Sequence, residues 1–156
     1  MRKLIPLLTV IAIVGVLAAD VAGSTAATKA PKITCTFKNF SQTPQQLSGF
    51  GFGYIRCPQP FGRGVQSATY SETVNATTGA ATLKGTFTNW FDAGTVYGTY
   101  SLHGQFTSAT AATYKGTFTT KGGTGADKGA KITGTLTCST RDAGATSSCT
   151  SVSTGH

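Results

Sequence analysis

The chain is 156 residues long and carries a formal net charge of +8, although only 12% of its residues are charged. Its length suits one domain with a core of its own. The basic residues are scattered and lie in no nucleic-acid-binding motif, so we expect no nucleic-acid partner. The positive charge is typical of a soluble basic surface, and an anionic partner such as an acidic polysaccharide is the more specific interpretation.

The first 27 residues are predicted to be a cleaved signal peptide. Arg2 and Lys3 supply its positive start, residues 4–19 its apolar run, and small residues follow. The run is shorter than the roughly 20 residues of a membrane-spanning helix and ends at Asp20, so we expect no membrane span in the mature protein. No cysteine follows the run, so no lipid attachment is expected. We therefore expect a secreted, extracellular protein with a signal peptide at 1–27, a mobile lead-in at 28–31 and a folded domain at 32–156.

After residue 31 the sequence alternates between apolar and polar residues and lacks the 3.6-residue period of a helix. β-branched and aromatic residues fill the alternating stretches, and turn residues such as Gly, Pro and Asp separate them. This pattern predicts eight strands, at 32–39, 49–57, 65–74, 80–91, 95–107, 111–120, 130–139 and 145–152.

A six-residue pattern occurs three times, at 83–88, 114–119 and 132–137. In each copy one face reads large, Gly, large, and strand 95–107 follows the same rule. A mid-strand Gly weakens a flat sheet but permits the tight bend of a barrel. We therefore predict an all-β fold, a single eight-stranded antiparallel β-barrel whose interior is filled by side chains or holds one small ligand. The residues expected to be buried are Leu83, Phe87, Tyr100, Phe106, Tyr114, Phe118, Ile132 and Leu136, and those expected to be exposed are Lys84, His103 and Lys115.

The segment 122–130, followed by Gly134 and Thr135, resembles the loop-and-strand signature of the allene oxide cyclase-like and dirigent-like barrels. The resemblance covers roughly residues 65–140 and rests mostly on Gly and Thr. It implies an eight-stranded secreted barrel, like the small bacterial relatives of unassigned function. No position matches an active-site residue of a cyclase or a dirigent protein, so the resemblance implies no catalytic residue.

Four cysteines lie in the mature chain, and an even number in an exported protein predicts two disulfides. They contain no C-x-x-C pair, so we expect no metal site, and nothing indicates a cofactor. Folding the chain about the turn at 142–145 sets Cys138 opposite Cys149, within disulfide range. Cys35 and Cys57 flank one loop, so we predict the pairs Cys35–Cys57 and Cys138–Cys149. A Cys35–Cys138 bond is the alternative.

Glu72 is the only glutamate and the most distinctive candidate for a binding site. It shares a strand face with Tyr70, and on the preceding strand Arg56 shares a face with Tyr54. If both faces point inward, these four residues form a ligand site in which an Arg–Glu pair is a polar anchor or a perturbed acid. The alternative is a salt bridge at the barrel rim.

An aromatic row precedes this arginine. Phe50, Phe52 and Tyr54 alternate with Gly51 and Gly53. We expect the row to be buried in the core, although an exposed row would suit stacking on sugar rings.

No catalytic residue is predicted. Serine-type catalysis needs a base beside its nucleophile, whereas His103 falls on the Thr-rich outer face and His156 is the last residue.

The sequence thus predicts a secreted, non-catalytic barrel that binds a small apolar ligand or a cell-envelope component such as an anionic polysaccharide. An isomerase or cyclase that acts on a hydrophobic substrate inside the barrel is the alternative. Whether the interior holds an open cavity with Glu72 in it separates these two, and a filled interior would favour a structural or surface-interaction module.

Overall fold

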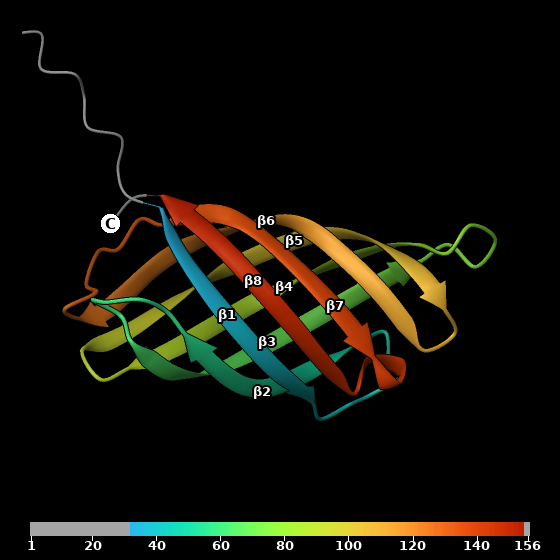
Figure 1. Cartoon of the computed structure of the whole chain (residues 1–156), viewed down its shortest axis with the longest axis horizontal. Helices are drawn as coiled ribbons and strands as arrows, with labels where there is room; N and C mark the ends of the chain where they lie inside the picture. The colour runs from blue at the N-terminus through green and yellow to red at the C-terminus, as the bar shows by residue number, and fades with distance from the viewer. Residues whose placement is uncertain (1–31, 155–156) are drawn as a thin grey trace, which may run out of the picture.

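Eight antiparallel strands form a closed barrel in the computed structural model, which describes residues 32–154 (Figure 1). Each strand pairs with the next along the chain, and the first also pairs with the last, so the sheet has no free edge. The strands are β1 (Ile33–Ser41), β2 (Ser48–Arg56), β3 (Arg63–Val74), β4 (Ala80–Phe91), β5 (Gly94–Ser108), β6 (Ala111–Gly125), β7 (Thr133–Arg141) and β8 (Thr146–Thr154).

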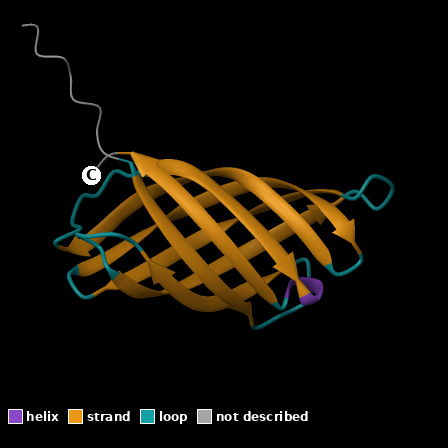
Figure 2. Cartoon of the chain, viewed as in Figure 1, coloured by secondary structure: helices purple, strands orange, loops and turns teal. Residues whose placement is uncertain are grey.

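This architecture confirms the predicted fold class. Within residues 32–154 the only helical element is a short 3₁₀ turn, η1 (Asp142–Gly144), between β7 and β8 (Figure 2). None of the helices in that part of the chain is long and apolar enough to cross a membrane. The expected signal peptide and lead-in lie outside the described residues.

One strand boundary differs clearly from the prediction. The strand predicted at 111–120 was expected to end at residue 120, but β6 continues to Gly125. The pairing with β5 shifts by one residue between Tyr97 and Gly98, because Lys121 is an extra residue on β6. Such a bulge lets the pairing resume beyond it, so the Gly-rich segment 122–125 extends the strand.

The repeated large-Gly-large face points into the barrel. Gly116 lies between the inward Tyr114 and Phe118 and is opposite Leu102 on β5. A Cβ atom added at Gly116 would collide with the carbonyl oxygen of Ser101 and the Cα atom of Leu102. Glycine at this position therefore allows β5 and β6 to approach closely where the sheet curves.

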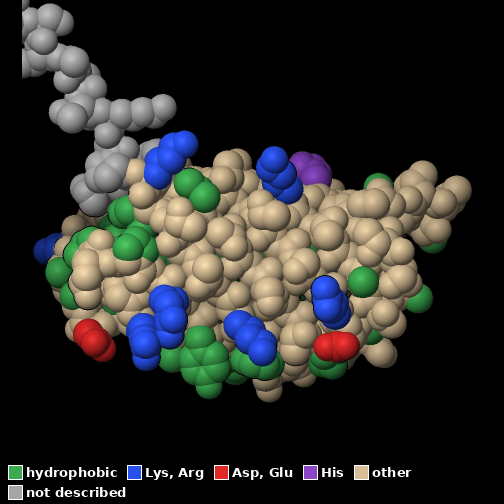
Figure 3. Space-filling model, viewed as in Figure 1, with side chains coloured by type: hydrophobic (Ala, Val, Ile, Leu, Met, Phe, Trp, Pro, Cys, Tyr) green, Lys and Arg blue, Asp and Glu red, His purple; other side chains and the backbone are tan. Residues whose placement is uncertain are grey.

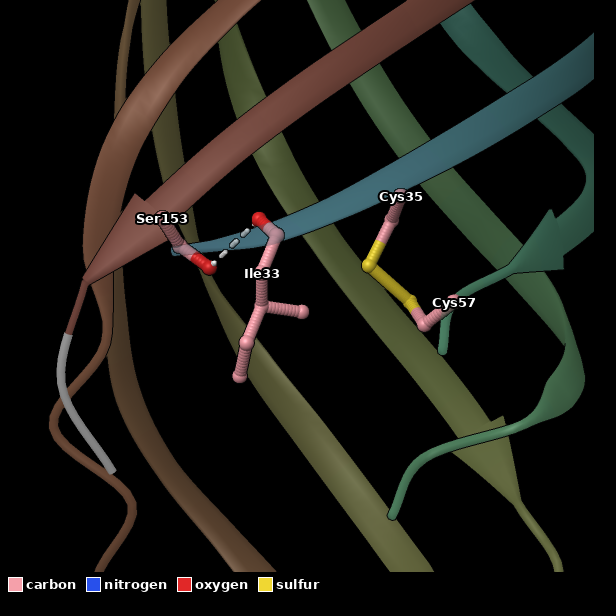
Figure 4. Close-up of a disulfide and its surroundings, with 4 residues drawn as sticks. All are labelled: Ile33, Cys35, Cys57 and Ser153. Atoms are coloured by element: carbon pink, nitrogen blue, oxygen red, sulfur yellow. Dashed lines mark hydrogen bonds between the residues drawn. A yellow bond between two sulfur atoms is a disulfide. The ribbon is translucent and has the colours of Figure 1, made fainter. Parts of the chain in front are cut away.

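The barrel is plugged at the end where β1 begins and β2 ends. Ile33, Cys35, Ile55 and Cys57 are buried there, with the rings of Phe61 and Phe91 packed against them. Figure 4 shows the Cys35–Cys57 disulfide beside Ile33, whose carbonyl oxygen accepts a hydrogen bond from the Ser153 hydroxyl of β8.

Both predicted disulfides are confirmed. Cys138 of β7 lies directly opposite Cys149 of β8, with 4.0 Å between their Cα atoms, as folding about the 142–145 turn predicts. Cys35 and Cys57 extend the β1–β2 register by one residue, with 4.2 Å between their Cα atoms. The two bonds are consistent with an extracellular protein.

The expected burial is only partly observed. Phe87, Tyr114 and Ile132 are buried, and Lys84, His103 and Lys115 are exposed, as predicted. The other five residues face inward but are only partly buried, because the middle of the barrel is not filled. These five are Leu83, Tyr100, Phe106, Phe118 and Leu136.

We predict that Gly116→Ala destabilises the fold by more than about 2 kcal/mol, because its new methyl group meets the backbone of β5. Thr117→Ala, at the neighbouring exposed position, should change the free energy of unfolding by less than about 1 kcal/mol. Denaturant unfolding of both variants measures the difference. Equal effects of the two substitutions would show that the inward glycine is not required.

Candidate functional site: the barrel interior

The barrel interior contains an open cavity at the end opposite the plug, which we call the mouth chamber. Its volume is about 470 Å³. Residues 45–47 of the β1–β2 loop, 109–110 of the β5–β6 turn and 143–144 of η1 contribute to its lining. Its wall within the barrel includes Tyr70, Glu72, Val74, Leu83, Tyr100, Phe106 and Tyr114.

A second cavity, the inner chamber, has a volume of about 120 Å³. The two chambers share Asn39, Ala68, Leu83, Tyr100, Tyr114, Thr140 and Ser147 in their linings, so they are neighbouring parts of one interior. The inner chamber adds apolar side chains, among them Phe37, Phe87, Phe118 and Leu136.

Small inward residues on two strands leave this space open. The inward face of β2 carries Gly51 and Gly53, which are buried without side chains. The inward face of β8 carries Ser147 and Ser151 around Cys149. Large residues on the facing strands do not fill the volume that these positions leave, so the interpretation with a filled interior is not supported.

Glu72 points into the mouth chamber and is held by Tyr114. The Tyr114 hydroxyl donates a hydrogen bond of 2.5 Å to Oε1 of Glu72. Burial of the phenol, followed by this hydrogen bond and the nearby carboxylate charge, raises the pKa of Tyr114 above its ordinary value. Tyr114 therefore stays protonated and serves as a fixed donor, while the second carboxylate oxygen of Glu72 has no hydrogen-bond partner within the described chain.

Two other tyrosines of the chamber donate hydrogen bonds to backbone carbonyl oxygens. The Tyr70 hydroxyl donates to the carbonyl oxygen of Thr43 at 2.6 Å, which ties the β1–β2 loop to the mouth. The Tyr100 hydroxyl donates to the carbonyl oxygen of Thr69 at 2.8 Å, across the space above Gly85. Burial, and then the nearby Tyr70, raises the pKa of Tyr100.

Three carboxamide side chains form a row inside the barrel, which we call the carboxamide row. Asn39 lies opposite Gly53, Gly53 opposite Gln66, and Gln66 opposite Asn89, on β1 to β4 in turn. Gln66 and Asn89 are each only 7% exposed. The side-chain oxygens of all three are buried and have no hydrogen-bond partner among residues 32–154. A buried acceptor without a partner costs about 1–3 kcal/mol, so these three side chains are polar groups that the protein's own hydrogen bonds do not satisfy.

The structure does not bring the four predicted ligand-binding residues together. Tyr70 and Glu72 line the mouth chamber, as expected. Tyr54 is 66% exposed on the outer wall, and Arg56 is exposed beside it, opposite Arg63 at the plugged end. The expectation that Tyr54 and Arg56 face inward is therefore corrected, and Arg56 pairs with Glu72 neither inside the barrel nor at its rim.

The physical reason is the period of two along β2. Cys57 faces inward to bond Cys35, so Ile55, Gly53 and Gly51 also face inward, and Arg56 must face outward. The aromatic row was also expected to point inward and be buried, but its residues lie on the same outward face as Arg56. The predicted disulfide was the signal that could have settled the orientation of β2 from the sequence.

The aromatic row instead belongs to an exposed surface, which we call the outer apolar patch and define as Phe40, Phe50, Phe52, Tyr54, Val65 and Trp90. Phe40 is directly opposite Phe52, and Val65 lies between Tyr54 and Trp90 in the strand register. Figure 3 shows hydrophobic side chains next to Lys and Arg along the lower edge of the molecule, where β2 lies in Figure 1.

The raised pKa values of Tyr100 and Tyr114 predict a loss of stability at high pH. Both phenols keep their protons in the folded protein at pH values where the unfolded chain, with a value of 10.0, releases them. Their contribution is complete below about pH 10 and is lost as the pH rises further. We expect Tyr114→Phe to make this decline in the free energy of unfolding shallower, with Tyr97→Phe, which removes an exposed phenol, as the control. An unchanged slope in Tyr114→Phe would contradict the role of its burial.

No family model, curated protein or solved structure matches this chain, so the resemblance to the allene oxide cyclase-like and dirigent-like barrels stays a prediction.

Proposed function

We propose that the protein is a secreted, non-catalytic carrier that holds a small, largely apolar ligand inside its barrel. The observation that carries the proposal is the mouth chamber of about 470 Å³, which opens at one end of an otherwise closed sheet. Cavities of this size with mainly apolar walls and a few polar groups are typical of small-molecule sites. The predicted signal peptide and the two disulfides support a site of action outside the cell.

Burial of the ligand's apolar surface supplies the driving force in this proposal. Leu83, Phe118 and Leu136 line the inner chamber, and the described chain buries them only in part. A ligand that covers them gains roughly 25 cal/mol for each Å² of apolar surface removed from water. The plug at the far end leaves entry through the loops around residues 45–47, 109–110 and 143–144.

The isomerase or cyclase alternative would use Glu72 as its acid or base. Among the described residues that line the chambers, Glu72 is the only carboxylate, and none is a histidine, lysine or arginine. Tyr114 already donates to one oxygen of that carboxylate. We favour binding over turnover because this site offers one carboxylate and phenols that stay protonated, and no second group that exchanges protons near neutral pH.

We predict that Ala68→Phe abolishes binding of the neutral fluorescent probe N-phenyl-1-naphthylamine. Ala68 lines both chambers, and a phenyl ring there would occupy their shared space. Thr73→Phe, on the exposed face of the same strand, is the control and should keep the wild-type affinity. Fluorescence titration measures the affinity, and circular dichroism confirms that both variants fold. Equal binding by folded Ala68→Phe would place the probe outside the barrel, and recovery of an added ligand in altered form would favour the isomerase alternative.

A second candidate function is supported by the outer apolar patch, which we propose to bind an anionic polysaccharide. Exposed aromatic rings stack on sugar rings, and basic residues surround these. Lys38 Nζ lies 5.6 Å from the centre of the Phe40 ring. Arg56 and Arg63 are directly opposite each other, and like charges so placed repel. A polyanion bound across the two guanidinium groups would relieve that repulsion.

We expect Tyr54→Ser and Arg56→Ser each to weaken retention on immobilised polygalacturonate severalfold, and added salt to weaken it further. Lys84→Ser removes one exposed cation away from the patch and is the charge-matched control. Equal losses in Arg56→Ser and Lys84→Ser, with wild-type retention of Tyr54→Ser, would reduce the effect to net charge and overturn the role of the patch. A concentration-dependent dimer that Tyr54→Ser dissociates would assign the patch to a second copy of the chain instead.

A further inference from the structure

Glu72 lies in the mouth chamber without a cation to pair with. Among the described residues that line the two chambers, it is the only one with a charged side chain. All ten described Lys and Arg side chains are exposed, and none of them lines a chamber. Arg56, the partner that the sequence suggested, is one of these exposed residues. The chamber therefore presents a negative charge that the described chain does not balance.

One oxygen of this carboxylate is available to a ligand. Tyr114 donates to Oε1, and this hydrogen bond fixes the carboxylate from across the interior. The other oxygen has no hydrogen-bond partner within the described chain. Unlike the oxygens of the carboxamide row, it is not fully buried, and Glu72 as a whole is only partly buried. A ligand in the mouth chamber can therefore contact this oxygen directly.

Aromatic side chains form much of the wall around the carboxylate. Four lining residues of the mouth chamber are aromatic: Tyr70, Tyr100, Phe106 and Tyr114. The three tyrosine hydroxyls already donate hydrogen bonds within the protein, so none of them is a free donor for an anionic ligand. Aromatic rings attract cations through their π electrons and are the usual walls of sites for ammonium groups. Carboxylate and rings thus favour the same kind of ligand.

Filling the chamber turns this arrangement into selectivity. Water can solvate the free Glu72 oxygen when no ligand is bound, but a ligand that fills the chamber displaces that water. A neutral ligand without a donor would leave the charge unpaired, and a carboxylate would place a second negative charge beside it. An alcohol would donate one hydrogen bond. An ammonium group would donate a stronger one, because hydrogen bonds between two ionised groups exceed those with a neutral partner.

We propose that the mouth chamber selects an organic cation, an amine with a largely apolar body, whose ammonium group pairs with the free oxygen of Glu72. Leu83 lies directly opposite Glu72 in the β3–β4 register and lines both chambers. The apolar body extends past Leu83 toward the inner chamber. This inference rests on the proposed function, because it names the ligand class of the same cavity.

The test compares three ligands of nearly the same shape and different charge. The cation is 1-naphthylmethylamine, the neutral ligand is 1-naphthalenemethanol, and the anion is 1-naphthoate. Each competes with N-phenyl-1-naphthylamine, near neutral pH, for the mature protein with its disulfides intact. We expect the ammonium to displace the probe about tenfold better than the alcohol, and the carboxylate to be the weakest. A tenfold ratio corresponds to about 1.4 kcal/mol.

A charge-matched pair of variants locates the effect. Glu72→Gln removes the charge, keeps the size of the side chain and leaves an amide oxygen to accept from Tyr114. It should reduce the preference for the ammonium over the alcohol to less than threefold, with the affinity for the alcohol changed by less than about twofold. Asp92→Asn removes one exposed carboxylate next to Phe91 of the plug and should keep the tenfold preference.

A second pair makes the test independent of whether Glu72→Gln folds. Val74 lines the mouth chamber and lies on the same face of β3 as Glu72. Val74→Lys therefore places a cation where the ligand's ammonium would bind, and it should remove the preference for the ammonium. Thr73→Lys adds the same charge on the exposed face of the strand and should keep the preference.

Each result has one consequence. Failure of the wild-type protein to bind the probe overturns the proposed function and the inference together. Binding of the probe with equal or better displacement by the alcohol or the carboxylate overturns the inference alone. A preference for the ammonium that persists in folded Glu72→Gln, or that Asp92→Asn and Thr73→Lys lose as well, also overturns it, because the carboxylate in the chamber would then not be its cause.

Discussion

Closure of the sheet fixes which face of every strand points inward, and the rest of the structure depends on that constraint. β1 pairs with both β2 and β8, so no strand can slip by one residue without exchanging its two faces. The two disulfides bond inward-facing cysteines and hold this choice at two places, Cys35–Cys57 and Cys138–Cys149. Because side chains alternate between the two faces of each strand, this fixed orientation also determines which residues point inward, including Glu72 and the carboxamide row.

The distribution of side-chain size then decides that the barrel is open at one end. Ile55, Phe61 and Phe91 fill the plugged end around one disulfide. Toward the mouth, Gly51 on β2 and Ser147 on β8 occupy inward positions with little volume. The result is a sheet that is sealed along its sides and one end, with the described Lys and Arg side chains on its outside.

The alternation of apolar and polar residues predicted the fold well, because the formation of strands and turns depends mainly on residues that are close together in the sequence. The alternation and the repeated glycine faces predict eight strands, and the turn at 142–145 sets the pairing of Cys138 with Cys149 as the structure has it. The site was predicted only in part. Tyr70 and Glu72 line the mouth chamber, as predicted. Which residues of β2 point inward is set by Cys57, next to the end of the strand, and this places the aromatic row on the outside.

The carboxamide row could not be found from sequence because its members lie on separate strands. Asn39, Gln66 and Asn89 are 23 or more positions apart in the chain, and only the register of β1 to β4 places them in one row, with Gly53 between the first two. Likewise, Tyr114 meets Glu72 across the interior rather than along a strand, at a sequence separation of 42. Contacts of this kind depend on the closed shape and on the volume left empty within it.

The central claim is that the barrel is a container, and its most direct test is the mass of the protein purified from its own host under native conditions. We expect a mass above that of the disulfide-bonded mature chain, with the excess released by denaturation as a small, largely apolar molecule. A native mass equal to that of the bare chain, together with a crystal structure that shows only ordered water in both chambers, would contradict the account.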